Sequence, residues 1–74
     1  PAGVRVHIAA ERAGERVAVP FTVDGVRHVT PGPLQDLNDY ATLTFPSNRT
    51  FTVEMEGRVF THRAEPGAIY VEQL

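Results

Sequence analysis

Apolar and polar residues alternate along most of this chain. Near its start, Val4, Val6 and Ile8 alternate with charged or small residues. A period of two places successive side chains on opposite faces of the backbone, which is typical of a β-strand with one buried face. The same pattern recurs in residues 16–23, 26–29, 40–45, 50–56, 59–62 and 69–73. We therefore expect about six to seven short strands.

The dipeptide Asp24-Gly25 predicts a tight turn between two of these strands. It separates two short runs that are rich in Val, Phe and Thr. A type I′ turn requires positive φ at both central residues, which Asp tolerates and Gly adopts freely. The turn predicts a hairpin in which Val23 faces Val26 and Phe21 faces His28.

Other turn residues divide the remaining strands. Glu56-Gly57 predicts a second tight hairpin, and Pro66-Gly67 fits the central positions of a type II turn. Pro20 cannot donate a hydrogen bond to a sheet, so it predicts an edge, a bulge or a bend within residues 16–23. We interpret residues 33–39 as a single helical turn or a packed loop, because the segment is too short for a stable helix.

These elements predict one all-β domain over residues 1–74 with no substantial helix. Short strands separated by regular turns are typical of a small antiparallel β-sandwich or a partly open barrel. The core is expected to contain apolar side chains of the middle strands: Val17, Val19, Phe21, Val23, Leu43, Phe45, Phe51, Val53 and Met55.

The chain contains a short internal repeat. Phe21-Thr22-Val23 recurs as Phe51-Thr52-Val53, and each copy precedes a Gly-containing turn and then a His, either His28 or His62. One interpretation is a duplicated ribbon whose two copies pack face to face. The other is that two β-hairpins in one small protein look alike because they use the same turn chemistry.

Residues 20–34 resemble the PEGA-like and Ig-like small β modules of bacterial surface proteins. The resemblance rests on Phe21-Thr22-Val23-Asp24-Gly25, followed by Thr30-Pro31 and the apolar Leu34. It implies a non-catalytic, extracellular, all-β unit.

Composition and charge restrict the classes of function. The 74 residues carry a net charge of −2, and their acidic and basic residues are interspersed, which does not favour a nucleic-acid surface. All seven basic residues are Arg, which suggests a GC-rich bacterium or its phage as the source. The sequence contains no Cys, no apolar run of membrane-spanning length and no signal peptide. We expect Pro1 to follow either removal of an initiator Met or cleavage of a signal.

Three histidines are the candidate metal ligands. His7, His28 and His62 all fall on expected strands, and three imidazoles that converge can bind zinc or copper. No pair has a spacing that forces convergence, and an isolated strand His is more often a surface residue. We therefore expect no metal site and no cofactor, and we expect added Zn²⁺ to leave the melting temperature unchanged.

Catalytic candidates are equally sparse. Ser47, the only Ser, lies in an expected turn without the setting of a nucleophile elbow. Glu54 and Glu56 share one strand face, as solvated carboxylates do, and glycosidase chemistry requires a deep cleft between them. Pro1 fits a tautomerase base only in a βαβ fold, which this pattern does not predict. The sequence does not indicate an enzyme.

The remaining classes are a structural protein and a binding module. We expect a non-enzymatic assembly protein, such as a small decoration or connector subunit of a phage particle, whose partners are other protein subunits. The alternatives are a ligand-binding or cell-surface β module of a larger secreted protein, or a metal-binding protein. A virion or extracellular location is favoured over the cytoplasm. We expect the first and last strands to be unpaired edges, with the protein–protein interface at Val4, Val6, Ile69, Tyr70 and Val71.

Overall fold

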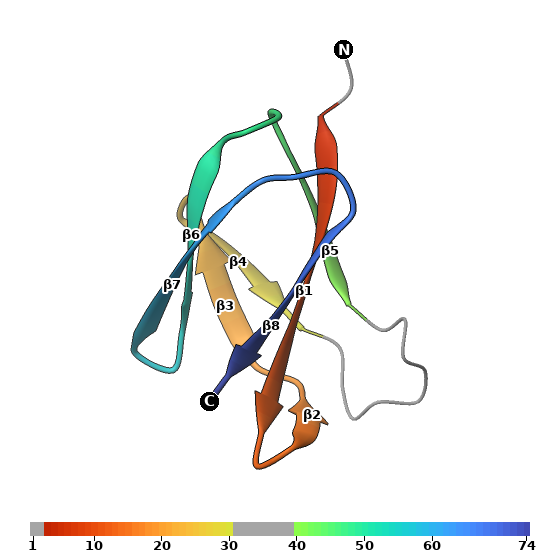
Figure 1. The fold of residues 1–74 in the computed structure, drawn as a ribbon. Coiled ribbons are helices and arrows are strands. Elements are labelled where there is room, and N and C mark those ends of the chain that lie inside the picture. The colour runs from red at the N-terminus through yellow and green to blue at the C-terminus, as the bar shows by residue number, and fades with distance from the viewer. Residues whose placement is uncertain (1–2, 31–39) are drawn as a thin grey trace.

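The computed structural model describes residues 3–30 and 40–74, which form two β-sheets stacked face to face (Figure 1). The described residues contain strands and turns but no helix, and hence no helix that is long and apolar enough to cross a membrane. The strands are β1 (Val4–Arg12), β2 (Glu15–Val17), β3 (Pro20–Val23), β4 (Val26–Val29), β5 (Ala41–Phe45), β6 (Thr50–Met55), β7 (Arg58–Arg63) and β8 (Ala68–Gln73).

The first sheet is built around β1. Along one edge, residues 6–11 of β1 pair with β8 in parallel. On the other edge, residues 4–8 pair with β5 and residues 10–12 pair with β2, both antiparallel. β8 therefore occupies one edge of β1. β2 and β5 share the other edge, one after the other along the length of β1. The longest of the described strands is therefore central in its sheet.

The second sheet has the strand order β4-β3-β6-β7, with every pair antiparallel. It consists of two hairpins, β3–β4 and β6–β7, which meet where Thr22 pairs with Glu54. The edge strands of this sheet are β4 and β7. In Figure 1 these two hairpins lie beside one another, behind and to the left of β1.

The chain passes from the first sheet to the second at Ala18 and Val19. Strand β2 ends at Val17 and β3 begins at Pro20, so Pro20 marks a bend between sheets, one of the three roles predicted for it. Thr30 fixes this corner to the end of β4. Its buried hydroxyl accepts a hydrogen bond from the Val19 amide (2.9 Å), and its own amide donates to the Val19 carbonyl (3.0 Å).

Three two-residue turns close the hairpins. Ala13-Gly14, Asp24-Gly25 and Glu56-Gly57 all have positive φ at both residues, as a type I′ turn requires. At Asp24-Gly25 the values are 51° and 77°, and the register opposes Val23 to Val26 and Phe21 to His28 as predicted. At the predicted type II turn, Gly67 has a φ of 70° and the Ala68 amide bonds the Glu65 carbonyl at 3.1 Å.

The core lies between the two sheets. Its buried members come from both of them: Val6, Ile8, Ala10, Val19, Phe21, Val23, Phe45, Phe51, Val53, Met55 and Ala64. Phe45 of one sheet and Phe51 of the other stack with ring centroids 4.3 Å apart. Burial of a side chain of this size contributes roughly 1.5–3 kcal/mol. Of the predicted core residues, Val17 and Leu43 are only half-buried and pack against this cluster.

The structure confirms an all-β, sandwich-like fold and corrects the predicted arrangement of its edges. The first strand is not an unpaired edge, because β1 is paired on both sides. The pairing of β1 with β8 is parallel, whereas we expected only antiparallel pairs. Of the two strands predicted as edges, β8 is one, as predicted for the last strand. The helical turn or loop at residues 33–39 lies outside the described residues.

Candidate functional site

The three histidines are separated in the fold, and each has its own environment. His7 on β1 lies 3.2 Å from the hydroxyl of Thr42, and His28 on β4 stacks on Phe21 with centroids 5.1 Å apart. His62 on β7 hydrogen-bonds a carboxylate of β8. In residues 3–30 and 40–74, no group of three His, Cys, Asp or Glu side chains could hold a metal ion. The three candidate ligands are not brought together there.

Side chains cross the gap between the edge strands β7 and β8, which we call the closed seam. The Nε2 atom of His62 lies 2.8 Å from Oε1 of Glu72, whose side chain is only 3% exposed. The ring of Tyr70 stacks on His62 with centroids 4.0 Å apart and planes 20° from parallel. The Tyr70 hydroxyl donates to the Arg63 carbonyl, and Arg58 donates to the Gln73 carbonyl at 3.0 Å.

This cluster is suited to holding the two sheets together. Burial, together with the nearby charge of Glu65, raises the pKa of Tyr70 above its usual value. The second carboxylate oxygen of Glu72 is buried, and no described residue offers it a hydrogen bond. The ring of Phe51 also lies near the imidazole of His62, with centroids 5.7 Å apart. No hydroxyl nucleophile bonds His62, so the described geometry does not form a catalytic triad.

The gap between the opposite edge strands, β4 and β5, is different, and we call it the open seam. It contains a hollow of about 220 Å³. Its walls are mostly apolar and come from Val23, Val26, His28, Leu43 and Phe45, with Thr44 beside them. At its end Asp24 forms an ion pair with Arg49, which joins the turn after β3 to the turn after β5.

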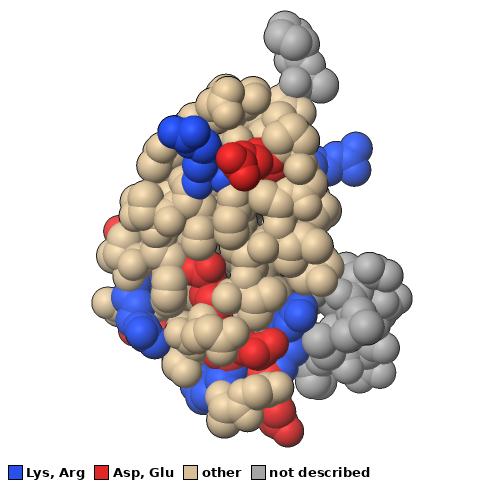
Figure 2. All heavy atoms as spheres, viewed as in Figure 1, with Lys and Arg blue, Asp and Glu red and all other residues tan. Residues whose placement is uncertain are grey.

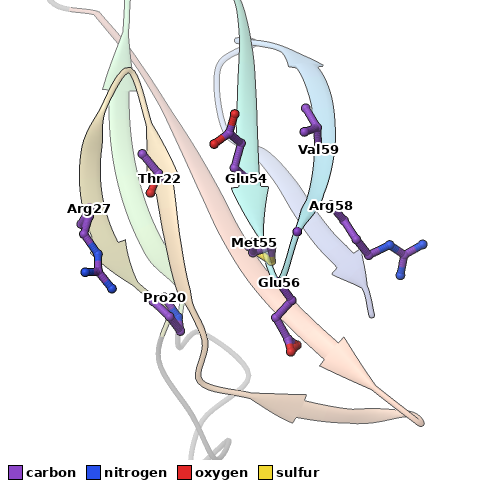
Figure 3. A pocket seen from close by; sticks show the side chains of 9 residues that line it. Pro20, Thr22, Arg27, Glu54, Met55, Glu56, Arg58 and Val59 are labelled. Atoms are coloured by element: carbon purple, nitrogen blue, oxygen red, sulfur yellow. The ribbon is translucent and has the colours of Figure 1, made fainter.

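A larger hollow, of about 470 Å³, lies on the outer face of the second sheet (Figure 3). Thr22 and Glu54 stand on its neighbouring central strands, whereas Arg58 extends away from the hollow at the other side. Glu56 also borders it, but its carboxylate pairs with Arg12. Its polar groups therefore do not converge on one point, and Glu56, one of the two carboxylates considered as a catalytic pair, is held by Arg12.

The described apolar residues with the greatest exposure all lie on edge strands. Val26 and Val29 on β4 are 56% and 66% exposed, Val59 on β7 is 62% exposed, and Ile69 on β8 is 55% exposed. Charged residues of both signs are interspersed on the face shown in Figure 2, without a field of one sign. Apolar contact surface therefore gathers at the sheet edges.

The predicted interface residues divide into two sets. Ile69 is exposed on β8, and Tyr70 and Val71 are half-buried beside it. Val6 is completely buried in the core of the monomer and Val4 is half-buried. The side chain of Val6 therefore cannot contact a partner, and its assignment to an interface is wrong. The reason is that β1 is central rather than an edge.

Sequence reasoning missed the role of Glu72. The last strand was expected to be an exposed edge, but its Glu72 is buried and points between the sheets, as Tyr70 two residues earlier also does. The only sequence signal for the burial of Glu72 was its distance of two residues from Tyr70, because residues two apart on a strand point to the same face. Of the catalytic candidates, Ser47 lies in an exposed turn and Pro1 lies outside the described residues.

No family model matches this chain, and searches of curated proteins and of solved structures find no match either. The resemblance of residues 20–34 to PEGA-like modules therefore stays a prediction.

Proposed function

We propose that this chain is a non-enzymatic structural protein that works through contacts with other protein subunits, such as a small decoration or connector subunit of a phage particle. The observation that carries the proposal is the position of the exposed apolar residues. Val26, Val29, Val59 and Ile69 all lie on edge strands. Exposed edges that carry apolar side chains are the usual site of strand-to-strand association between chains.

The size of the protein supports the same proposal. A chain of 74 residues without Cys has one thin core and no disulfide to stabilise it. Contacts with neighbouring subunits would bury the exposed edge residues and add stability by mass action. The interspersed charges and the absence of converging polar groups in the described hollows fit contact with protein surfaces better than chemistry on a small substrate.

Fractionation of the native source tests the proposal. We expect the chain to sediment with a large particle and to be depleted from the fraction of free small proteins. A chain found only as a free monomer would contradict the proposal. The double variant Val29→Lys, Val59→Lys should fold, because both side chains are exposed, but should lose incorporation. Thr52→Lys, at an exposed position on the central strand β6, is the matched control and should be incorporated normally.

A ligand-binding or cell-surface β module of a larger secreted protein is the second candidate. It is favoured by the hollow of about 470 Å³ on the outer face of the second sheet. For this function, a bound ligand should perturb the amide resonances of Thr22 and Glu54 rather than those of the edge strands.

A further inference from the structure

The hairpin register determines which backbone groups of β4 remain free. In a hairpin with a two-residue turn, the residues that flank the turn exchange both hydrogen bonds, and bonded and non-bonded pairs then alternate. Val23 and Val26 flank the turn, so Arg27 and Val29 occupy non-bonded pairs. Pro20, which has no amide hydrogen, lies opposite Val29 and fits this assignment. The amides and carbonyls of Arg27 and Val29 therefore point away from β3, and no described strand pairs with them.

The open seam lies directly beside this free edge. Val26 and His28, on the inward face of β4, line one side of the hollow, and Leu43 and Phe45 of β5 line the other. Val26 is 56% exposed although it faces the space between the sheets. Backbone donors and acceptors that no described strand pairs thus lie next to an apolar hollow, whose outer wall also has no described strand. This combination fits an added strand whose alternate side chains enter the hollow.

We propose that the open seam binds an extended segment of another protein chain, which adds to β4 as a strand. The inference rests on the proposed function and specifies its partner. The segment carries apolar side chains at alternate positions, directed at Val26 and Leu43, and its backbone bonds Arg27 and Val29. Its paired length is limited by the four residues of β4. The ion pair of Asp24 with Arg49 closes the hollow at the end nearest the turns.

A second copy of this chain fits the open seam less well. With Arg27 opposite Arg27 of the other copy, like charges would face each other across the ladder. A pairing of His28 with His28 avoids this clash but joins only two four-residue edges. A stable dimer interface buries roughly 1,200 Å² or more, and two four-residue edges offer only a short ladder toward that area. The closed seam is less suitable for an added strand, because His62, Tyr70 and Arg58 already cross it.

A nuclear magnetic resonance titration tests the inference on the whole chain. The probe is a capped peptide of alternating Thr and Val, about five residues long to match β4. We expect shift changes in the amides of Arg27, Val29 and residues 41–45. A peptide with Asp in place of Val should leave them unchanged. Changes confined to β7, β8 or the outer hollow, or no changes at all, would overturn the inference.

Two variants test the two parts of the contact. Arg27→Pro removes one outward amide on an edge strand, where Pro is tolerated, and should weaken peptide binding about fivefold or more. Val26→Glu places a charge at the hollow and should also weaken binding, whereas Val59→Glu, on the far edge of the same sheet, should not. Equal binding by all three variants would contradict the inference. Should Arg27→Pro fail to fold, the comparison of Val26→Glu with Val59→Glu decides alone.

The free chain provides the last arm of the test. We expect its β4 resonances to be independent of protein concentration. Concentration-dependent shifts at β4 without peptide would identify a second copy as the occupant and overturn the inference. These measurements on the isolated chain do not depend on fractionation of the native source. The inference of strand addition can therefore be contradicted while the proposed assembly function still holds.

Discussion

The closed and open seams are the two places where edge strands of the two sheets meet, and side chains fill them differently. Each seam separates the edge strand of one sheet from the edge strand of the other, and neither is joined by backbone pairing. At the closed seam, the buried Glu72, its partner His62 and the stacked Tyr70 fill the gap. At the open seam, the described contact across the mouth is an exposed ion pair, and a hollow remains behind it.

The difference follows from strand length and from what the aromatic rings of the edge strands stack on. β7 and β8 each have six residues, and the rings of His62 and Tyr70, one from each strand, stack on each other across their seam. β4 and β5 have four and five residues, and their rings, His28 and Phe45, stack on Phe21 and Phe51 rather than on each other. Closure of a two-sheet fold therefore depends on the side chains of its edge strands, and a weakly filled seam is where another chain can add.

The two hairpins of the second sheet show a related difference. Phe21 lies opposite His28 in one hairpin and Phe51 lies opposite His62 in the other, so the sequence repeat corresponds to a repeated cross-strand pair. The second hairpin extends two residues further beyond this pair before its turn. His62 meets a carboxylate from β8, whereas the described ring contact of His28 is with its own hairpin partner, Phe21.

The largest expected effect is at the closed seam. His62→Leu removes the hydrogen-bond partner of Glu72 and leaves its buried carboxyl group without one. We expect the free energy of unfolding to fall by about 2–4 kcal/mol, less than for a fully buried pair because the His62 side chain is 19% exposed. Chemical denaturation measures it. The double variant with Glu72→Leu should recover much of the loss, and a neutral single variant would show that the pair does not hold the seam.

The next effect is at the turn beside the open seam. Gly25→Val places a β-branched residue at a φ of 77°, and we expect a loss of more than about 1 kcal/mol. No atom lies within 4 Å of the added Cβ position, so the loss would come from the backbone alone. Gly25→Asn, which adopts positive φ more readily, should cost less. Equal melting temperatures for the two variants would contradict a type I′ turn.

A smaller effect is expected at the closed seam in alkaline solution. The folded state raises the pKa of Tyr70, chiefly through burial, so folding favours the neutral phenol. This contribution to stability is present below the unfolded pKa, which is about 10, and is lost as the pH rises through the higher folded value. Thermal melts between pH 9 and pH 12 should show a steeper decline for the native chain than for Tyr70→Phe; parallel declines would contradict the assignment.

The smallest effect is expected at the open seam. Asp24→Asn keeps a residue that tolerates positive φ but removes the ion pair with Arg49. Because both side chains are about half exposed, we expect a loss below about 1 kcal/mol, decreasing further at high salt. Thermal melts at low and high salt measure it. A loss as large as that of His62→Leu would show that the two seams are equally closed.

Much of the fold was predictable from local patterns. The Val-Asp-Gly-Val hairpin appeared with the predicted register and φ values because a two-residue turn between β-formers depends on residues close in sequence. The position of Val6 was predicted wrongly for the opposite reason. Its alternating pattern fits an edge strand and a central strand equally well, and only the partners of β1 distinguish them.

The pair of Glu72 with His62 was beyond sequence reasoning. The apolar Ile69 and Val71 on β8 appear the better candidates for burial, yet Ile69 is 55% exposed and Glu72 is buried. A shift of one residue in the pairing of a strand moves every side chain to the opposite face. Which face of β8 is inside therefore depends on how it pairs in its sheet.

The sequence by itself determined that this chain forms short strands linked by tight turns, because alternation and turn residues act over a few neighbouring positions. The tertiary structure alone decided the strand order, the parallel pairing of β8 with β1 and the difference between the two seams. Those features depend on residues far apart in the chain, such as Arg49 with Asp24 and Glu11 with Gln73. Their contact follows from how the sheets stack, which a period of two does not specify.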